Sequence, residues 1–317
     1  MAEENKPVVL TFGGGLNARQ RSADINIEEC TEGENFNLDF QSAVLAPRQG
    51  IILRAVAPNG EPSRGIAQLV KQDGTISTII QAGGTVFSWD GTDTGFIEVG
   101  TVSPDARLRG PIDSNFTLDN FIIITDLAKI ENVKKWTGEV FTDLEHNLGV
   151  DFKAKYVTVQ TERAIFANVK TGTVDTPHVI LASKQGDSEV LTSTTRPAAA
   201  ASAEDEWFLP TPDLRPINGI TFFAKNLLLS TERGRLYAIE GLIAGKDTDG
   251  LPFTSIEDFH AGSAVSGDEA LINIGNDVAM GLPGRIETLS GVLEFGDVET
   301  NDASWWISPL LDGTFGT

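Results

Sequence analysis

The chain has 317 residues, 40% of them hydrophobic, which suffices for one large all-β domain or two ordinary domains around a substantial core. Its 45 acidic residues outnumber the 24 basic ones, and the resulting net charge of −21 creates a field that repels nucleic acid. The single cysteine, Cys30, excludes an intramolecular disulfide and a cysteine-rich zinc site.

The N-terminal sequence MAEENKP is acidic and lacks the apolar stretch of a signal peptide, so we expect no classical export signal. The strongly apolar runs, such as residues 121–124, are far too short to span a membrane, and no membrane anchor is expected. Residues 240–317 contain fourteen acidic residues and two basic ones. This excess indicates either a well-solvated surface or an acidic wall past which DNA slides without binding.

Residues 1–27 are predicted to form an N-terminal arm. They include three glycines at residues 13–15, but no Lys-Ser or Lys-Thr pair follows, so a phosphate-binding loop is not expected. Residues 28–53 are predicted to form a β-hairpin. Its first strand shows the period of two that marks a half-buried strand, with apolar residues at Phe36, Leu38 and Phe40.

Beyond residue 60 the chain repeats a glycine turn that follows a short apolar strand, and only residues such as glycine and asparagine enter tight turns without strain. Successive turns are 47 to 55 residues apart: Trp89-Asp90-Gly91, Trp136-Thr137-Gly138, Lys184-Gln185-Gly186, Ile239-Glu240-Gly241 and Leu289-Ser290-Gly291. Each closes the third strand of a repeat unit, and the five units start near residues 65, 112, 153, 216 and 268.

Within the units, the predicted first strands are GIAQLV from Gly65, FTL near Phe116, KYVTVQ from Lys155, GITFF from Gly219 and ALINI from Ala270. A fourth, outer strand is predicted after the turn in three units, as GFIEVG from Gly95, EVFTDL from Glu139 and VLEF from Val292. Residues 196–205 and 241–252 are interpreted as surface loops between or within units.

Five units of about four strands are typical of a β-propeller, in which each small sheet buries its faces against its neighbours. The sequence therefore predicts an all-β fold: residues 28–317 form a β-propeller of five or six four-stranded blades, with an extended N-terminal arm. A sixth blade would combine the hairpin of residues 28–53 with a C-terminal strand around residues 305–307. The alternatives are five blades plus an arm, or a chain that continues beyond Thr317.

No constellation of residues suggests catalysis. None of the three histidines, His146, His178 and His260, lies near a nucleophile in a signature arrangement, and the G-x-S-x-G and H-E-x-x-H motifs are absent. Residues 247–250 (DTDG) begin like a calcium loop, but Pro252 stands at its sixth position and an aspartate at its twelfth. We therefore predict no enzyme, no catalytic, cofactor-binding or metal-binding residue, and no cofactor.

Nucleic-acid binding has one candidate cluster, Lys134-Lys135-Trp136, which is too small for a basic stripe. Paired carboxylates of a glycosidase cannot be selected among 45 acidic residues by sequence alone. A carbohydrate-binding propeller, or a glycosidase with carboxylates at the centre of the ring, therefore stays open as an alternative.

Two stretches resemble structural proteins of tailed bacteriophages. The N-terminal motifs are Gly14-Gly15-Leu16-Asn17, Asn35-Phe36-Asn37-Leu38-Asp39 and Arg48-Gln49-Gly50-Ile51. Residues 262–290 are similar to a late blade of the tail-nozzle and packaged-DNA-stabilisation proteins, through Gly275-Asn276-Asp277 and Gly284-Arg285-Ile286.

The resemblance implies a virion protein of the tail or neck that is assembled in the host cytoplasm. It implies a homo-oligomeric ring, a hexamer, around the DNA exit channel, with other tail, portal or adaptor proteins as partners. DNA would pass nearby without being specifically bound. The acidic residues between Asp268 and Asp302 would then suit a channel lining that repels DNA.

Overall fold

The structure is a computed structural model. It describes residues 15–16, 29–30, 36–39, 44–47, 55–71, 73–92, 94–110, 121–160, 162–192, 206–223, 226–232, 235–240, 255–260, 265, 267–268, 270–273, 278–282, 285–292 and 297–302. Across these residues the fold is all-β, with five four-stranded antiparallel sheets and two two-stranded sheets. No helix in these ranges is long and apolar enough to cross a membrane.

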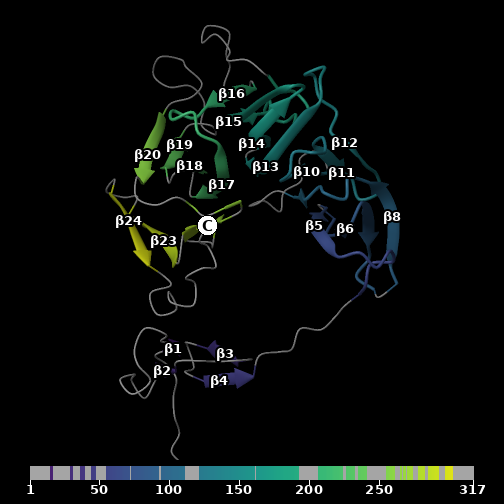
Figure 1. Ribbon diagram of the computed structural model, residues 1–317, viewed down its shortest axis with the longest axis horizontal. Helices are drawn as coiled ribbons and strands as arrows, with labels where there is room; N and C mark the ends of the chain where they lie inside the picture. Colours follow the sequence, from purple (N-terminus) through teal and green to yellow (C-terminus); the bar gives the residue numbers. More distant parts are fainter. Residues whose placement is uncertain are drawn as a thin grey trace, which may run out of the picture.

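The five four-stranded sheets follow one another along the chain, and within each sheet neighbouring strands are also consecutive in sequence (Figure 1). Sheet 1 contains β5 (Ser63–Val70), β6 (Ile76–Ala82), β7 (Thr85–Trp89) and β8 (Phe96–Thr101). Sheet 2 contains β9 (Leu108–Arg109), β10 (Ile122–Asp126), β11 (Lys134–Trp136) and β12 (Phe141–Asp143). Sheet 3 contains β13 (Phe152–Gln160), β14 (Arg163–Thr171), β15 (Val174–Ala182) and β16 (Trp207–Pro210). Sheet 4 contains β17 (Ile217–Phe223), β18 (Asn226–Thr231), β19 (Arg235–Glu240) and β20 (Ser255–His260). Sheet 5 contains β21 (Leu271–Asn273), β22 (Val278–Leu282), β23 (Arg285–Val292) and β24 (Asp297–Asp302).

The N-terminal region contributes two small sheets. Strand β1 (Gly15–Leu16) pairs in parallel with β2 (Glu29–Cys30). Strand β3 (Phe36–Asp39) pairs antiparallel with β4 (Val44–Pro47), which confirms the predicted hairpin. In the described part of the chain, β3 and β4 form a sheet only with each other. Residues 305–307, predicted to pair with this hairpin, lie outside the described residues.

The predicted turns are confirmed where the structure describes them, with one exception. Gly91, Gly138 and Gly186 have φ values of 90°, 94° and 76°, in the left-handed region that glycine enters without strain. The exception is Gly291, which is paired with Val298 inside β23. Antiparallel pairing satisfies its backbone groups as well as a turn would, so the chain continues in extended form. Gly241 lies outside the described residues.

One predicted strand is wrong, and another lies outside the described residues. The fourth strand of sheet 5 is not VLEF from Val292, because Val292 ends β23 and the outer strand is β24. The predicted first strand near Phe116 lies outside the described residues, and the first strand of sheet 2 is β9, which begins at Leu108. The surface loops predicted at residues 196–205 and 241–252 also lie outside the described residues.

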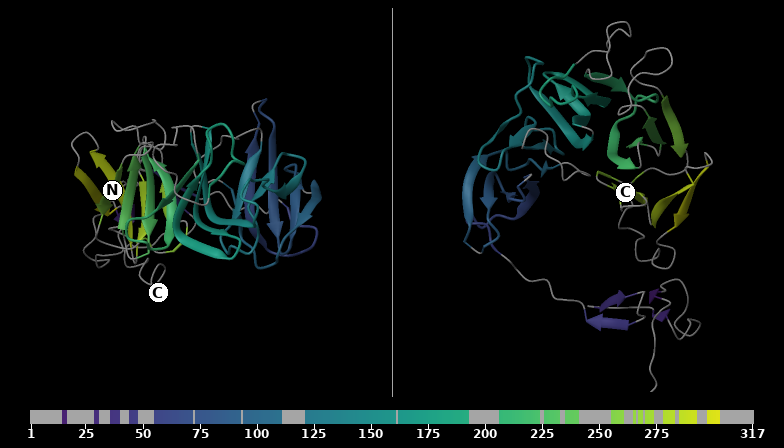
Figure 2. Two further views of the ribbon diagram at one scale, coloured as in Figure 1. Left: turned by 90° about the horizontal axis from the view of Figure 1, so that it is seen from above. Right: turned by 180° about the vertical axis from the view of Figure 1, so that it is seen from behind.

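The sheets stand in a row that curves around a common centre, with first strands on the inner side and fourth strands on the outer side (Figures 1 and 2). Neighbouring sheets meet at their inner strands, since β5 contacts β9, β13 contacts β17, and β17 contacts β21. This arrangement explains why apolar runs such as residues 121–124 do not alternate. Ile122 and Ile124 pack towards sheet 1, whereas Phe121 and Ile123 pack towards sheet 3.

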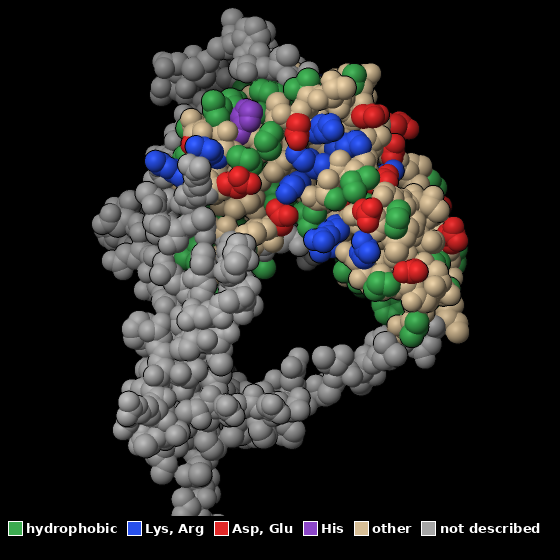
Figure 3. Space-filling model, in the orientation of Figure 1, with side chains coloured by type: hydrophobic (Ala, Val, Ile, Leu, Met, Phe, Trp, Pro, Cys, Tyr) green, Lys and Arg blue, Asp and Glu red, His purple; other side chains and the backbone are tan. Residues whose placement is uncertain are grey.

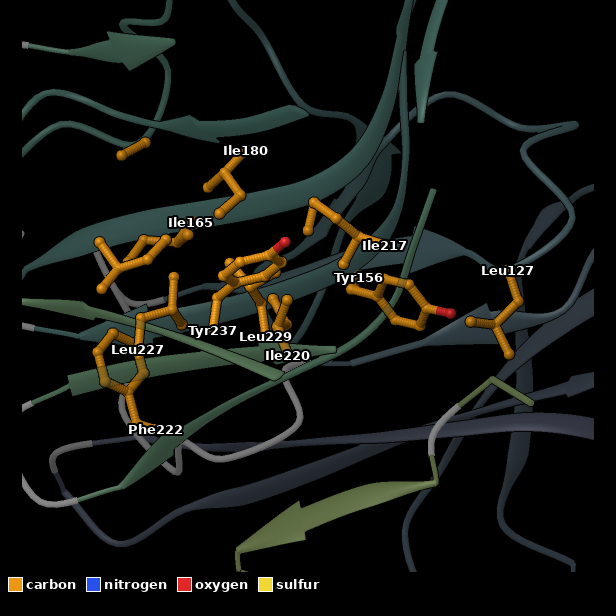
Figure 4. Packing of buried hydrophobic residues seen from close by; sticks show 13 residues of the cluster. Leu127, Tyr156, Ile165, Ile180, Ile217, Ile220, Phe222, Leu227, Leu229 and Tyr237 are labelled. Carbon is orange, nitrogen blue, oxygen red and sulfur yellow. The ribbon is translucent and has the colours of Figure 1, made fainter. Parts of the chain in front are cut away.

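The hydrophobic core is divided into four clusters, one between each pair of neighbouring sheets. The cluster between sheets 3 and 4 is shown in Figure 4, where Tyr156, Ile165 and Ile180 of sheet 3 lie beside Ile217 and Ile220 of sheet 4. At about 25 cal/mol per Å² of buried apolar surface, such clusters supply the main stabilisation of each interface. Each sheet is thus held chiefly by its immediate neighbours.

Candidate interaction surfaces

Charged residues are sorted by strand position within the five sheets. The first strands carry four basic residues and no acidic one: Arg64, Arg109, Lys153 and Lys155. The fourth strands carry seven acidic residues and no lysine or arginine: Glu98, Asp143, Glu257, Asp258, Asp297, Glu299 and Asp302. In the space-filling view, Lys and Arg side chains border the hollow and continue across the face, and Asp and Glu side chains lie along the right-hand margin and also on the face (Figure 3). Within the described sheets, basic positions therefore gather on the first strands and acidic positions on the fourth strands.

The acidic channel lining expected between Asp268 and Asp302 stays a prediction, because Asp268 is the one acidic residue of that stretch whose side chain the structure describes. Asp268 lies near the inner strands, and its Oδ1 is 3.2 Å from Lys155 Nζ. The Tyr156 hydroxyl lies 2.5 Å from the same oxygen and 3.0 Å from the carbonyl of Asn218. Asp268 thus joins sheets 3 and 4 to the segment that leads into sheet 5, and its charge is compensated.

Sheets 1 and 2 are also joined by hydrogen bonds from buried polar side chains. The Gln81 side chain, 1% exposed, donates to the carbonyl of Ala106 at 2.8 Å and accepts from the N–H of Leu108 at 2.9 Å. From the other side, Asp126 Oδ1 accepts from the N–H of Arg107 at 2.7 Å. The segment that crosses from sheet 1 to sheet 2 is therefore held by buried side chains of both sheets.

Asp126 also organises the turn that follows it. It is 1% exposed, and its carboxylate accepts four backbone N–H groups in total. The three within the turn belong to Ala128, Ile130 and Glu131, at 3.0, 2.7 and 3.0 Å. Each oxygen of this buried carboxylate already accepts two hydrogen bonds, so Asp126 has a structural role.

The Lys134-Lys135-Trp136 cluster, considered above for nucleic-acid binding, is occupied by contacts within the chain. Lys134 Nζ lies 2.6 Å from Asp143 Oδ1, and Lys135 Nζ lies 2.8 Å from Glu189 Oε1. Burial lowers the pKa of Lys134, but its hydrogen bonds outweigh this effect and the pKa is raised. Trp136 is fully buried and its indole N–H donates to Ser77 Oγ at 3.2 Å.

None of the three histidines was predicted to be catalytic, and the structure describes the surroundings of His146. Its ring packs edge-on against Phe152, with 5.6 Å between the ring centres, and burial lowers its pKa. His178 lies in β15 and His260 ends β20. The part of the chain that the structure describes contains no group of three or more His, Cys, Asp or Glu side chains that could hold a metal ion. Residues 247–250 lie outside it.

No protein-family model matches the chain, and no curated protein matches it. Among solved structures, it is similar to the extracellular domain of a hybrid two component system from B. thetaiotaomicron, with a TM-score of 0.47, 12% identity, and coverage of 79% of this chain and 29% of that one. It is also similar to a chain of a nidogen/laminin complex, with a TM-score of 0.44, 11% identity, and coverage of 76% of this chain and 80% of that one. For PorZ of Porphyromonas gingivalis the TM-score is 0.41 at 12% identity, with coverage of 78% of this chain and 29% of that one. Likeness at this level concerns sheet arrangement alone and says nothing of function.

Proposed function

We propose that the chain is a β-propeller subunit, of five or six blades, in the tail or neck of a tailed bacteriophage virion. In this role it forms a homo-oligomeric ring, a hexamer, around the DNA exit channel and helps to retain and pass the packaged genome. The observation that supports the proposal is that four of the five fourth strands, β8, β12, β20 and β24, carry acidic residues and no lysine or arginine. Together with the phage-like N-terminal motifs and the repeating sheets, this observation suits a structural protein that acts through its surfaces and not through catalysis.

The proposal takes DNA past the outer strands. The described inner strands carry Arg64, Arg109, Lys153 and Lys155 and no acidic residue, so they do not support an acidic passage through a single subunit. In a ring of subunits, the shared channel is lined by those fourth strands of each subunit that face the axis of the ring. Acidic edges repel phosphates and release no counterions, so duplex DNA slides past them without being held.

The proposal assigns the partners and the location that the resemblance implies. The subunit contacts further copies of itself and other tail, portal or adaptor proteins, and it is assembled in the host cytoplasm into the virion. The carbohydrate-binding or glycosidase alternative requires carboxylates at the centre of the ring. Asp268 lies near the described inner strands but is hydrogen-bonded and paired with Lys155, so no observation favours that alternative.

The test is to reverse the charge of the outer strands without breaking an ion pair. Glu98→Lys in β8 and Thr142→Lys in β12 replace exposed side chains of neighbouring outer edges. In phage carrying both changes, DNA ejection should slow, and the slowing should weaken with added salt. The purified variant should bind duplex DNA with a salt slope of about −0.9 per phosphate contacted.

Glu232→Lys is the matched control, because Glu232 is exposed in the connection after β18, away from the outer strands. It changes the net charge of the chain by as much as Glu98→Lys does. Normal ejection by both variants, or equal slowing by both, would contradict the proposal. Absence of the protein from purified virions would contradict it more directly.

A further inference from the structure

One face of sheet 1 carries five apolar residues that belong to no cluster between sheets, beside the polar residues Gln68, Thr78 and Glu98. Residues directly opposite each other on paired strands share a face. Ile66 lies opposite Ile80, Ile80 opposite Phe87, and Trp89 opposite Phe96. We call these five residues the end face of sheet 1. The rings of Phe87 and Phe96 meet edge-on at 5.9 Å, and Trp89 stacks on Phe96 at 6.0 Å.

The end face differs from the opposite face of the same sheet, which packs on sheet 2 through Leu69, Ile79 and Val86. On the end face, Ile66 is 61% exposed, Ile80, Trp89 and Phe96 are partly exposed, and Phe87 is buried, whereas Leu69 on the opposite face is completely buried. Apolar side chains left exposed within a strand mark a candidate contact site in soluble proteins. In Figure 1, sheet 2 lies on one side of sheet 1, and no described four-stranded sheet covers the other side.

Sheet 5, at the other end of the row, also has an exposed apolar residue on the face turned away from its neighbour. Leu271 and Met280 are buried against sheet 4, but Ile272, on the opposite face, is 50% exposed. The three sheets between the ends contribute buried residues to clusters on both faces. Among the described residues, the first and last sheets of the row thus each leave apolar side chains exposed on their outward faces, and a further sheet between them would cover both.

We propose that the hairpin β3–β4 of the same chain packs on the end face of sheet 1 and begins a sixth sheet. Phe36 lies opposite Pro47 and Leu38 opposite Leu45, so four apolar positions fall on one face of the hairpin. A two-stranded hairpin is marginally stable alone and gains a core by packing on such a face. The inference depends on the propeller architecture proposed above and is independent of the virion role.

The connection between the hairpin and sheet 1 favours the same chain over a second copy. Fifteen residues separate Pro47 from Ser63. Fully extended, they span about 50 Å at about 3.3 Å per residue, enough to reach a face of the sheet they lead into. A short tether also gives the hairpin an effective concentration in the millimolar range, which exceeds the concentration of other copies in dilute solution.

The test uses cross-linking in the full chain with Cys30→Ser as background, so that only introduced thiols react. Leu38→Cys is combined with Ile66→Cys, and a short bismaleimide reagent is added to dilute protein. We expect a cross-link within one chain, identified by peptide mass spectrometry at monomer mobility. Leu38→Cys with Val174→Cys is the control, because Val174 is 58% exposed but lies in sheet 3. It should react at least about tenfold more slowly.

A second measurement covers the case in which the cysteine variants misfold. Leu38→Asp should lower the melting temperature of the full chain, whereas Asn37→Asp, on the opposite face of the hairpin, should leave it nearly unchanged. Cross-links only between chains would identify a second copy as the occupant and overturn the proposal. Equal reaction of both cysteine pairs, or equal melting of both aspartate variants, would also overturn it. Neither outcome depends on whether the protein is found in virions.

Discussion

Asp126→Asn tests the contact between sheets 1 and 2 with a change of one atom. The carboxylate of Asp126 is buried, and each of its oxygens accepts two backbone N–H groups at 2.7 to 3.0 Å. An asparagine keeps one oxygen and turns an NH₂ group towards two N–H donors. Two charge-assisted hydrogen bonds are lost, each worth about 1.5–3 kcal/mol, so we expect the unfolding free energy to fall by about 3–6 kcal/mol.

Equilibrium urea unfolding of the purified chain measures this loss, with an unchanged m-value as evidence that the two states remain comparable. Asp175→Asn is the control, since its side chain is 51% exposed and pairs with Lys129 at 2.6 Å. A surface pair contributes about 1 kcal/mol or less. If Asp126→Asn cost no more than Asp175→Asn, the assignment of Asp126 as the organiser of this connection would be refuted.

Three further substitutions probe other contacts. Tyr156→Phe removes the hydroxyl beside Asn218 and Asp268 and should lower the unfolding free energy by about 1–2 kcal/mol, measured by urea titration. Because burial holds the pKa of His146 below its ordinary value of 6.5, protonation favours the unfolded state. Stability should therefore decline as the pH falls through 6.5, and His146→Gln should flatten that decline in urea titrations at a series of pH values. Gly91→Ala should cost about 1–2 kcal/mol in thermal unfolding from backbone strain alone, because φ is 90° and no atom lies within 4 Å of the added carbon.

The repeating sheets were predictable because turns separate the apolar strands, and the turn residues are ones that take the required backbone angles without strain. Gly91 and Gly138 take left-handed angles that other residues avoid, and they close the third strand of their sheets as predicted. Strand β9, of two residues, is too short to show any period. Strand β24 reads DVETND, and aspartate, asparagine and glutamate are all disfavoured in strands, so only its pairing with β23 reveals it.

The interaction surfaces were less accessible to sequence analysis, because their residues are distant in the chain. Tyr156 and Asp268 are 112 positions apart, and no local pattern predicts that they meet. Asp126 resembles any acidic residue at the end of an apolar strand, and only the tertiary structure shows its burial. The sorting of charges became visible only after the strand order within each sheet was known. The acidic excess of the C-terminal part was evident from composition, but the position of its acidic residues on the fourth strands β20 and β24 was not.

The acidic fourth strands have a consequence for how copies of the chain can touch. In the described part of the chain each fourth strand is an edge of its sheet, and all of them except β16 carry acidic residues. The backbone N–H and C=O groups of a sheet edge invite a strand from another molecule. Two such edges brought together would place aspartates and glutamates opposite one another, and like charges directly across a strand pair are destabilising. Subunits are thereby steered away from merging their sheets, and any assembly must be built through faces, loops or the N-terminal segment.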